Sequence, residues 1–464
     1  MTTVVTALAP GTRRGFELLL VVLSVGISTA AYALVGLTLG GQLPARLVAV
    51  SGGLLGLGLL LHVVVRVVAP YADPVMIPIA LLINGLGLVM IHRLDLAKDP
   101  VTSLAVRQLG FTALGVVTAA VVLVVLRDHR RLRARTYTAM VAGLVLLLLP
   151  LVPGIGRTVN GATIWIDLGV TTFQPAELGK IAVVVFFAGY LVVARDTLSL
   201  VGPKVLWLRL PRARDLGPIL VAWVASVGIL VFERDLGTSL LFFGIFVAML
   251  YVATERVSWI VIGLGLFAGG CVVAWRLFSH VQRRVDVWLD PFDPERIEAR
   301  GGSYQVVQAL YGMADGGLLG TGLGRGSPEI VPFAESDFIV AALGEELGLA
   351  GLFGIFLLYA ILVQRGIRTA IGVRDGFGKL LACGLSFAVA MQVFVVAGGV
   401  TRVIPLTGLT MPFLAYGGSS LLGSWVVVAL LLRISDLARR PDLPETRPPS
   451  LPADDARTQA LRPA

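Results

Sequence analysis

Three acidic residues lie close together at the start of one long apolar segment of the sequence. Asp337 follows a polar stretch of about sixty residues, and Glu345 and Glu346 lie inside the apolar segment itself. An ionised side chain at membrane depth costs roughly 2.5–3.5 kcal/mol, so it is usually retained for a function. A lone acid at a helix start is more simply a residue that suits the helix dipole. Three acids beside a loop rich in counter-charges favour a functional site, with Asp337 at the edge of the membrane.

A second acidic residue, followed by a lysine, opens another apolar segment. Pro175 suits a first helical turn, where its missing N–H is not needed. Glu177 and Lys180 then share one face of the helix and can pair. A capping acid and a lysine that extends its amine to the membrane surface explain the same two residues. The sequence leaves the functional and the structural interpretation of this pair open.

The polar stretch at 278–336 contains basic residues and many glycines. Arg283 and Arg284 lie near its start, Gln305 lies in its middle, and five glycines fall within 316–324. Glycines at this density allow a backbone to approach a ligand closely, and exposed backbone N–H groups suit phosphate. The arginines and Gln305 are therefore candidates for contacts to a phosphorylated substrate, although a glycine-rich loop alone is weak evidence.

A late apolar stretch at 404–420 is interrupted by proline and glycine and ends in Ser419 and Ser420. Lipid cannot satisfy the hydrogen bonds of an irregular backbone, so such a segment must be buried in protein or line a cavity. We expect a re-entrant segment beside a site, with the two serines as candidate substrate contacts. A polar turn at 233–238 completes the set of polar stretches.

The elements that position these residues are membrane-spanning helices. Of 464 residues, 56% are hydrophobic and only 14% are charged, and the mean hydropathy is +0.87. A soluble domain carries about 25% charged residues, so the composition indicates a polytopic membrane protein. The net charge of +9 reflects arginine-rich loops rather than nucleic-acid binding. Two cysteines and four scattered histidines form neither a disulfide framework nor a metal motif.

The expected fold is all-α, with about twelve spans of roughly twenty residues each. The predicted spans lie near 16–38, 48–68, 75–94, 106–126, 136–152, 176–194, 217–232, 236–253, 257–277, 338–363, 379–400 and 417–434. The first run is too long for a cleavable signal peptide. The tail at 438–464 has no apolar periodicity and is expected to be a disordered cytoplasmic segment.

Arginines give the expected orientation. They are concentrated in the connections after the fourth, sixth, tenth and last spans, as in 127–135. Arginine-rich loops lie in the cytoplasm, so both termini, including residues 1–15, are expected inside. The large loop at about 278–336 is then outside, and Asp337 faces the exterior of the cytoplasmic membrane.

Five blocks in the same order resemble the SEDS family (shape, elongation, division and sporulation), whose members include RodA and FtsW. The blocks are 173–180, 235–238, 283–285 with 290–291, 336–348, and 405–408 with 416–420. The chain departs from the family pattern at Thr163 and Ile164, where arginines are usual, and at Arg234, where proline is usual. A common asparagine is also missing from 395–399. These departures concern donor binding rather than the reaction.

The resemblance implies a ten-helix glycosyltransferase core at about 71–437, preceded by an additional helical pair at 16–70. Short termini are more similar to RodA than to FtsW. The implied activity is polymerisation of lipid II into peptidoglycan strands at the outer membrane face, with undecaprenyl pyrophosphate as leaving group. The implied partner is a class B penicillin-binding protein, and the implied cation is Mg²⁺ or Mn²⁺ carried on the pyrophosphate. The family's catalytic aspartate falls on Asp337, and its conserved glutamate and lysine fall on Glu177 and Lys180.

Residue chemistry agrees with that reaction. A carboxylate such as Asp337 can act as general base toward a sugar hydroxyl, which is worth about 10²–10⁴-fold. Lys180, Arg283 or Arg284 can stabilise the departing pyrophosphate. A flippase for lipid-linked sugars is the alternative, because broken segments and buried charges also suit transport. A scaffold without chemistry is a third interpretation. The acids gather at one outer face rather than at mid-membrane, which favours the polymerase.

Overall fold

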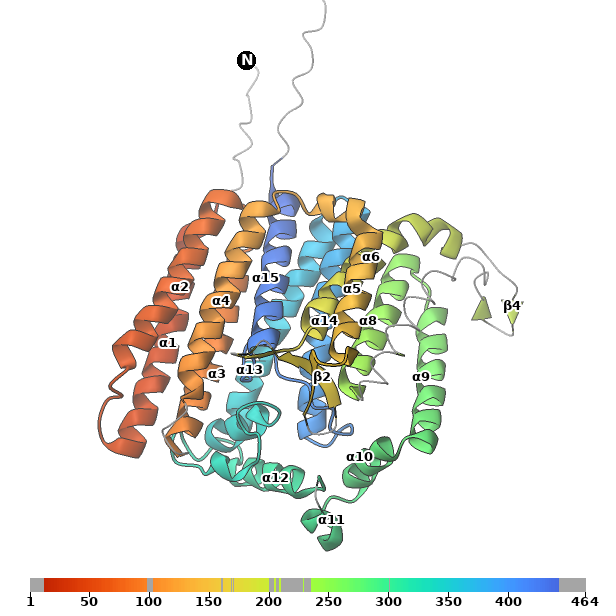
Figure 1. Ribbon diagram of the computed structural model, residues 1–464. Coiled ribbons are helices and arrows are strands. Elements are labelled where there is room, and N and C mark those ends of the chain that lie inside the picture. Colours follow the sequence, from red (N-terminus) through yellow and green to blue (C-terminus); the bar gives the residue numbers. More distant parts are fainter. Residues whose placement is uncertain are drawn as a thin grey trace, which may run out of the picture.

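The protein is a bundle of long helices with several short helices at one end (Figure 1). The computed structural model describes residues 12–97, 103–159, 162–167, 169, 171–199, 204–205, 208–209, 228, 235–299 and 301–441. Within these ranges, eleven helical segments are long and apolar enough to cross a membrane. The all-α, multi-pass architecture is therefore confirmed. The predicted span at 217–232 lies outside the described residues, apart from residue 228.

The long helices agree closely with the predicted spans. They are α1 (Arg14–Gly40), α2 (Leu47–Val68), α3 (Met76–Ala97), α4 (Leu104–Val125), α5 (Thr136–Leu148, flanked by the 3₁₀ turns η1 at His129–Arg135 and η2 at Leu149–Leu151), α6 (Ala176–Ser199), α8 (Leu236–Thr254), α9 (Ser258–Leu277), α13 (Ile339–Gly372), α14 (Gly376–Val400) and α15 (Gly418–Arg439). Side-chain caps define several starts. Ser103, Asp235 and Asp375 accept hydrogen bonds from backbone N–H groups in the first turns of α4, α8 and α14.

The large loop has its own secondary structure. It contains α10 (Ser279–Leu289), α11 (Pro294–Glu298), α12 (Tyr304–Gly316) and the 3₁₀ turn η3 (Pro328–Ile330). These elements cover the end of the bundle opposite the start of α1 and the end of α15 (Figure 1). We call this end the loop end.

Two small antiparallel sheets add to the helices. The first has the order β1–β2–β3 (Gly156–Val159, Ala162–Asp167 and Thr172–Phe173), and the second pairs β4 (Lys204–Val205) with β5 (Leu208–Arg209). Nothing in the apolar pattern predicts these short strands.

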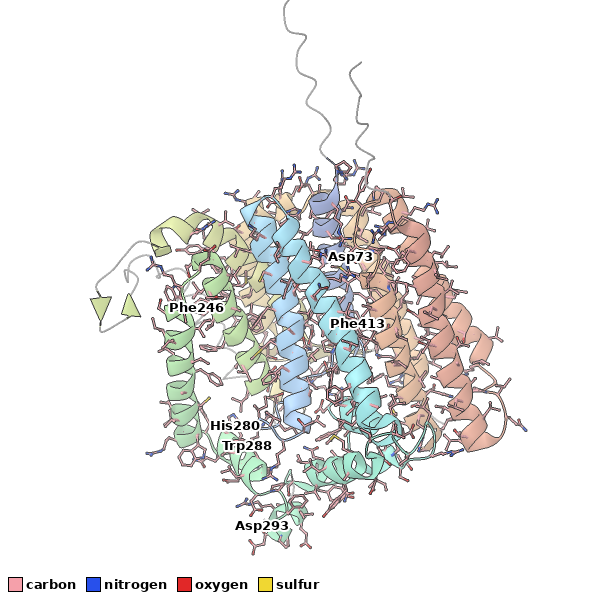
Figure 2. All side chains as sticks on the ribbon, turned by 180° about the vertical axis from the view of Figure 1, so that it is seen from behind. Asp73, Phe246, His280, Trp288, Asp293 and Phe413 are labelled. Carbon is pink, nitrogen blue, oxygen red and sulfur yellow. The ribbon has the colours of Figure 1, made fainter. Side chains whose placement is uncertain are left out.

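The helices α3, α6 and α15 are the most buried of the long helices, whereas in α9 only Trp259 and Gly263 are buried. The segment at 401–417 runs among them as irregular backbone, and Figure 2 shows Phe413 inside the bundle. Asn84 Nδ2 on α3 donates to the Phe413 carbonyl (3.2 Å). Gln108 Nε2 on α4 donates to the Ala415 carbonyl (3.0 Å). Protein side chains thus satisfy a backbone that lipid could not, as expected for a re-entrant segment.

Buried charges join the first helical pair to the rest of the bundle. Arg14 Nε donates to the Pro70 carbonyl (3.1 Å), just before α3. Glu17 Oε1 and His62 Nδ1 lie 2.7 Å apart, linking α1 to α2. Asp73 is fully buried at the same end and pairs with Arg439 at the end of α15 (Figure 2). This network anchors both ends of the described chain at the end opposite the large loop.

Candidate active site

Asp337 lies in the turn immediately before α13, at the loop end, and its side chain is half-buried. Burial raises the pKa of Asp337 to about 6. The positive charge of Arg284 opposes that rise, and the nearby carboxylate of Glu335 adds to it. A carboxyl group that titrates near neutral pH is well matched to accept a proton from a substrate hydroxyl.

Arg284 on α10 is the cation whose charge acts on Asp337. Its Nη1 donates to the carbonyl oxygens of Leu406 (3.2 Å) and Thr407 (3.1 Å). Burial lowers the pKa of Arg284, and the negative charges of Asp235 and Asp337 counteract this. Arginine nevertheless stays protonated in proteins. Arg284 is therefore a permanent positive charge that acts on two carboxylates and is held on the re-entrant segment.

Two further hydrogen bonds fix α10 on the same segment. Trp288 Nε1 donates to the Arg402 carbonyl (3.1 Å), and Arg402 Nε donates to the Trp288 carbonyl (2.7 Å). Figure 2 shows Trp288 on this helix, at the loop end of the bundle. The position of Arg284 consequently depends on the re-entrant segment rather than on the loop alone.

Asp235 caps the start of α8, and its charge acts on Arg284. Its carboxylate accepts hydrogen bonds from Thr238 N (2.9 Å) and Thr238 Oγ1 (2.6 Å). Burial raises the pKa of Asp235, while Thr238 and then Arg284 oppose that rise and Glu177 adds to it. The charge of Asp235 therefore acts on Arg284, and the charge of Glu177 acts on Asp235.

Glu177 and Lys180 pair as the sequence predicts, but neither reaches solvent. Both are 5% exposed, and Lys180 Nζ lies 2.5 Å from Glu177 Oε2. Lys180 Nζ also donates to Gln392 Oε1 (2.8 Å), and Gln392 Nε2 donates to the Thr410 carbonyl (2.9 Å). This geometry contradicts the interpretation in which the lysine extends to the membrane surface. The pair instead holds α6, α14 and the re-entrant segment together.

The remaining candidates divide into supporting and peripheral residues. Ser419 Oγ accepts a hydrogen bond from Gln174 N (2.8 Å) and so fixes the chain entering α6. Ser420 is buried, and its Oγ has no hydrogen-bond partner among the described residues. Arg283 is exposed and Gln305 is half-buried on α12. Neither forms a side-chain hydrogen bond or ion pair within the described part of the chain, so their role in substrate binding stays a prediction.

Glu345 and Glu346 contact the glycine-rich loop instead of approaching Asp337. Glu346 Oε1 pairs with Arg93 Nε of α3 (2.8 Å), and Glu346 Oε2 accepts from Gly324 N (2.9 Å). Glu345 Oε1 accepts from Ser327 N (2.5 Å). The two glutamates therefore hold the loop on α13.

The expectation that the glycine-rich loop offers its N–H groups to phosphate is contradicted. The N–H of Thr321 donates to the Glu345 carbonyl (2.9 Å), and that of Gly322 donates to the Glu346 carbonyl (3.0 Å). A Cβ on Gly320 would lie 2.3 Å from the Glu346 carbonyl oxygen. Gly316 and Gly320 therefore allow the loop to pack closely against α13.

Two residues that form buried contacts, Arg93 with Glu346 and Gln392 with Lys180, are not among the residues predicted from the sequence. Gln392 is an isolated polar residue deep in an apolar segment, and Arg93 lies with His92 and Asp95 near the end of another. An isolated polar residue at membrane depth normally has a buried partner, so this was a usable signal. Their partners lie far along the chain and could not be named from spacing alone.

Comparison with known proteins agrees with this architecture. Residues 74–440 match the family model FtsW/RodA/SpoVE, described as cell cycle protein. The chain is 50% identical to "Peptidoglycan glycosyltransferase RodA" of Mycobacterium tuberculosis, over 93% of this chain and 92% of the relative. It is 33% identical to "Stage V sporulation protein E" of Bacillus subtilis, over 79% of this chain and 98% of the relative.

Solved structures share the fold. A chain from "Structural coordination of polymerization and crosslinking by a peptidoglycan synthase complex" matches with a TM-score of 0.63 and 28% identity, over 80% of this chain and 99% of that one. The Rod shape determining protein RodA of Thermus thermophilus matches with a TM-score of 0.56 and 26% identity, over 78% of this chain and 96% of that one. The family match begins at residue 74, after α2. The chain belongs to the FtsW/RodA/SpoVE family, and is RodA-like within it.

Proposed function

We propose that this protein is a peptidoglycan glycosyltransferase that polymerises lipid II, with Asp337 as the catalytic base. The observation that carries the proposal is a half-buried carboxyl of raised pKa on which the charge of the fixed cation Arg284 acts, at one end of a membrane bundle. Acids without such a cation would repel a pyrophosphate. A cation without the acid would leave the attacking hydroxyl protonated.

The chemistry of Asp337 follows from its pKa. With a pKa of about 6, the ionised form exceeds the neutral form roughly tenfold at pH 7. The 4-hydroxyl oxygen of the acceptor sugar attacks the anomeric carbon of the donor, and its proton passes to Asp337. The bond between that carbon and the pyrophosphate oxygen breaks, and undecaprenyl pyrophosphate leaves. Arg284 is positioned to stabilise the charge that develops on the leaving group.

Glu177 and Lys180 have a positioning role in this proposal. Lys180 neutralises Glu177 and holds it next to the turn of Asp235, whose charge acts on Arg284. The pair thereby sets where the cation lies relative to Asp337. No contact of the Lys180 amine with substrate is required.

A divalent cation, Mg²⁺ or Mn²⁺, belongs to the same proposal. Among the described residues, no three or more acidic, histidine or cysteine side chains are grouped so that they could enclose an ion. Mg²⁺ commonly binds one or two carboxylates together with substrate phosphates. The acids around Asp337 suit a cation that arrives on the pyrophosphate and neutralises charge there. Removal of divalent ions with EDTA should abolish polymerisation, and Mg²⁺ or Mn²⁺ should restore it.

We further propose that the loop end faces the exterior and that both termini are cytoplasmic. Arginine-rich connections at the opposite end, including η1 (His129–Arg135), support this orientation. The related synthase-complex structure supports a penicillin-binding protein of class B as partner. The large loop is the surface we expect that partner to contact, raising the polymerisation rate.

The decisive experiment uses purified protein, labelled lipid II and Mg²⁺ in detergent. Products longer than one disaccharide support a polymerase. Asp337→Asn should lose the products, whereas Asp286→Asn, an exposed acid on α10, should keep them. If the wild-type protein forms no polymer but moves fluorescent lipid II between the leaflets of a vesicle, the flippase alternative replaces this proposal.

A further inference from the structure

A cavity lies at the loop end, between the first helical pair and the family core. Its volume is about 500 Å³, which is within the range of small-molecule sites. It is formed by α1 to α4, and its lining includes Tyr32, Gln42, Arg46, His92, Leu96 and Val106. None of the charged residues around Asp337 lines it, so it is separate from the candidate active site.

Arg46 is the cation among the residues that line this cavity. Arg46 lies in the turn between α1 and α2, is exposed, and forms no ion pair with any described residue. Asp95 is the acid among the lining residues, and its carboxylate accepts hydrogen bonds from Leu104 N (3.1 Å) and Ala105 N (2.7 Å) at the start of α4. The Asp95 carboxylate is directed toward the N-terminus of α4, whereas the Arg46 guanidinium has no acidic partner among the described residues and can attract an anion.

The wall beside Arg46 contains an unsatisfied polar atom. The ring of His92 stacks on Tyr32, with centroids 4.2 Å apart and planes inclined by 17°. Its Nε2 is shielded from solvent and has no hydrogen-bond partner among the described residues. A buried polar nitrogen without a partner is unfavourable. A polar group entering the cavity beside the ring, with a small movement of the ring, would remove that deficit.

The rest of the cavity is apolar and partly open. Leu39, Leu96 and Val106 line it and are each more than 40% exposed. They lie where membrane-spanning helices end, so hydrocarbon chains can reach them from the bilayer. A small inorganic anion would gain nothing from such walls, whereas an amphiphile would bury its chains there.

We propose that this cavity binds an anionic membrane lipid, with its phosphate at Arg46 and its acyl chains along the apolar wall. Its occupant is a bilayer lipid of the leaflet at the loop end. Next to the lining residue Leu39, Thr38 Oγ1 of α1 donates to the Leu323 carbonyl of the glycine-rich loop (3.0 Å). A bound lipid would thus stabilise the contact between the first helical pair and the core.

Native mass spectrometry of the detergent-purified protein tests the proposal without any polymerisation assay. Phosphatidylglycerol or phosphatidylcholine is added, and the lipids retained are counted and titrated. Wild-type protein should retain phosphatidylglycerol in preference to phosphatidylcholine. Arg46→Gln should weaken that retention about fivefold, as expected for one arginine near a charged surface. Ala45→Phe, which fills the cavity from an exposed lining position, should weaken retention of both lipids.

Arg66→Gln is the matched control. Arg66 is exposed at the opposite end of α2 and should leave retention unchanged. Thermal unfolding should show that all variants fold. Equal retention by the wild-type, Arg46→Gln and Ala45→Phe proteins would overturn the proposal. Loss of bound lipid in millimolar inorganic phosphate would also overturn it, by making the cavity a phosphate site. Neither result would affect the role of Asp337.

Discussion

Asp337→Asn separates catalysis from stability, because the same burial that suits the residue for catalysis destabilises its charge. The side chain keeps its size and polarity in the variant but no longer accepts a proton. We expect the polymerisation rate to fall about 10²–10⁴-fold, the usual contribution of a general base. At 1.36 kcal/mol per factor of ten, this corresponds to about 3–5 kcal/mol of transition-state stabilisation.

The expected effect on stability has the opposite sign. The pKa of Asp337 is about 6 in the folded protein, against 3.8 for an unperturbed aspartate. A raised pKa means that the folded state binds the proton more tightly, so this contribution to the free energy of unfolding is lost as the pH rises from about 4 to 6. Above pH 6 the ionised carboxylate costs at most about 3 kcal/mol, at 1.36 kcal/mol per unit. At pH 7 the amide removes that cost, so the melting temperature of Asp337→Asn should be unchanged or higher.

The assay is the initial rate of glycan formation from labelled lipid II, normalised to folded protein, between pH 5 and 8. The wild-type rate should fall as the pH drops through about 6, because Asp337 becomes protonated. Arg284→Gln should move this acidic limb to higher pH, since the cation favours the ionised form of Asp337. Retention of more than about a tenth of the wild-type rate by Asp337→Asn would refute the assignment, as would a rate loss that matches a loss of folded protein.

The remaining predictions concern the supporting residues, the orientation and the partner. Glu346→Gln breaks the buried pair with Arg93 and should destabilise the fold by about 3–5 kcal/mol, seen as a lower melting temperature, while turnover per folded molecule stays near wild-type. Lys180→Ala should lower turnover more than it lowers the folded fraction; normal polymerisation would reduce the pair to a packing role. In a variant without native cysteines, Leu319→Cys should react with an impermeant maleimide in intact spheroplasts, and Arg131→Cys should not; the reverse pattern would invert the topology. Adding the cognate penicillin-binding protein should raise the polymerisation rate, and an unchanged rate would contradict the role given to the large loop.

Span positions could be predicted because hydropathy and length fix them almost alone. The predicted span at 379–400 corresponds to α14 (Gly376–Val400). The predicted end at 363 was nine residues short, since α13 continues to Gly372. A helix needs apolar residues only within the membrane, and polar residues such as Arg365 and Arg368 continue it beyond that boundary. Hydropathy therefore locates a helix in the bilayer more reliably than it locates the helix end.

The site was predictable only in part, because composition does not reveal partners. Asp337 could be singled out as a charge at a membrane boundary and Arg284 as a basic residue of the polar loop, and in the structure the charge of Arg284 acts on Asp337. The glycine-rich loop was misinterpreted, since glycines that permit a ligand and glycines that permit a neighbouring helix give the same sequence signal. Arg93 and Glu346 pair across 253 positions, and no local pattern encodes such a contact.

The position of Arg284 links the loop to the chemistry. Its guanidinium is bonded to the re-entrant segment through Leu406 and Thr407, while its backbone belongs to α10 in the large loop. A displacement of α10 would therefore alter both the charge available to a leaving group and the pKa of Asp337. A partner that binds the loop can act on the rate through this one side chain, without contacting the acid. The signature would be a shift of the acidic limb of the pH–rate profile on adding the partner, absent in Arg284→Gln. A partner that raised the rate at every pH by the same factor would have to act elsewhere.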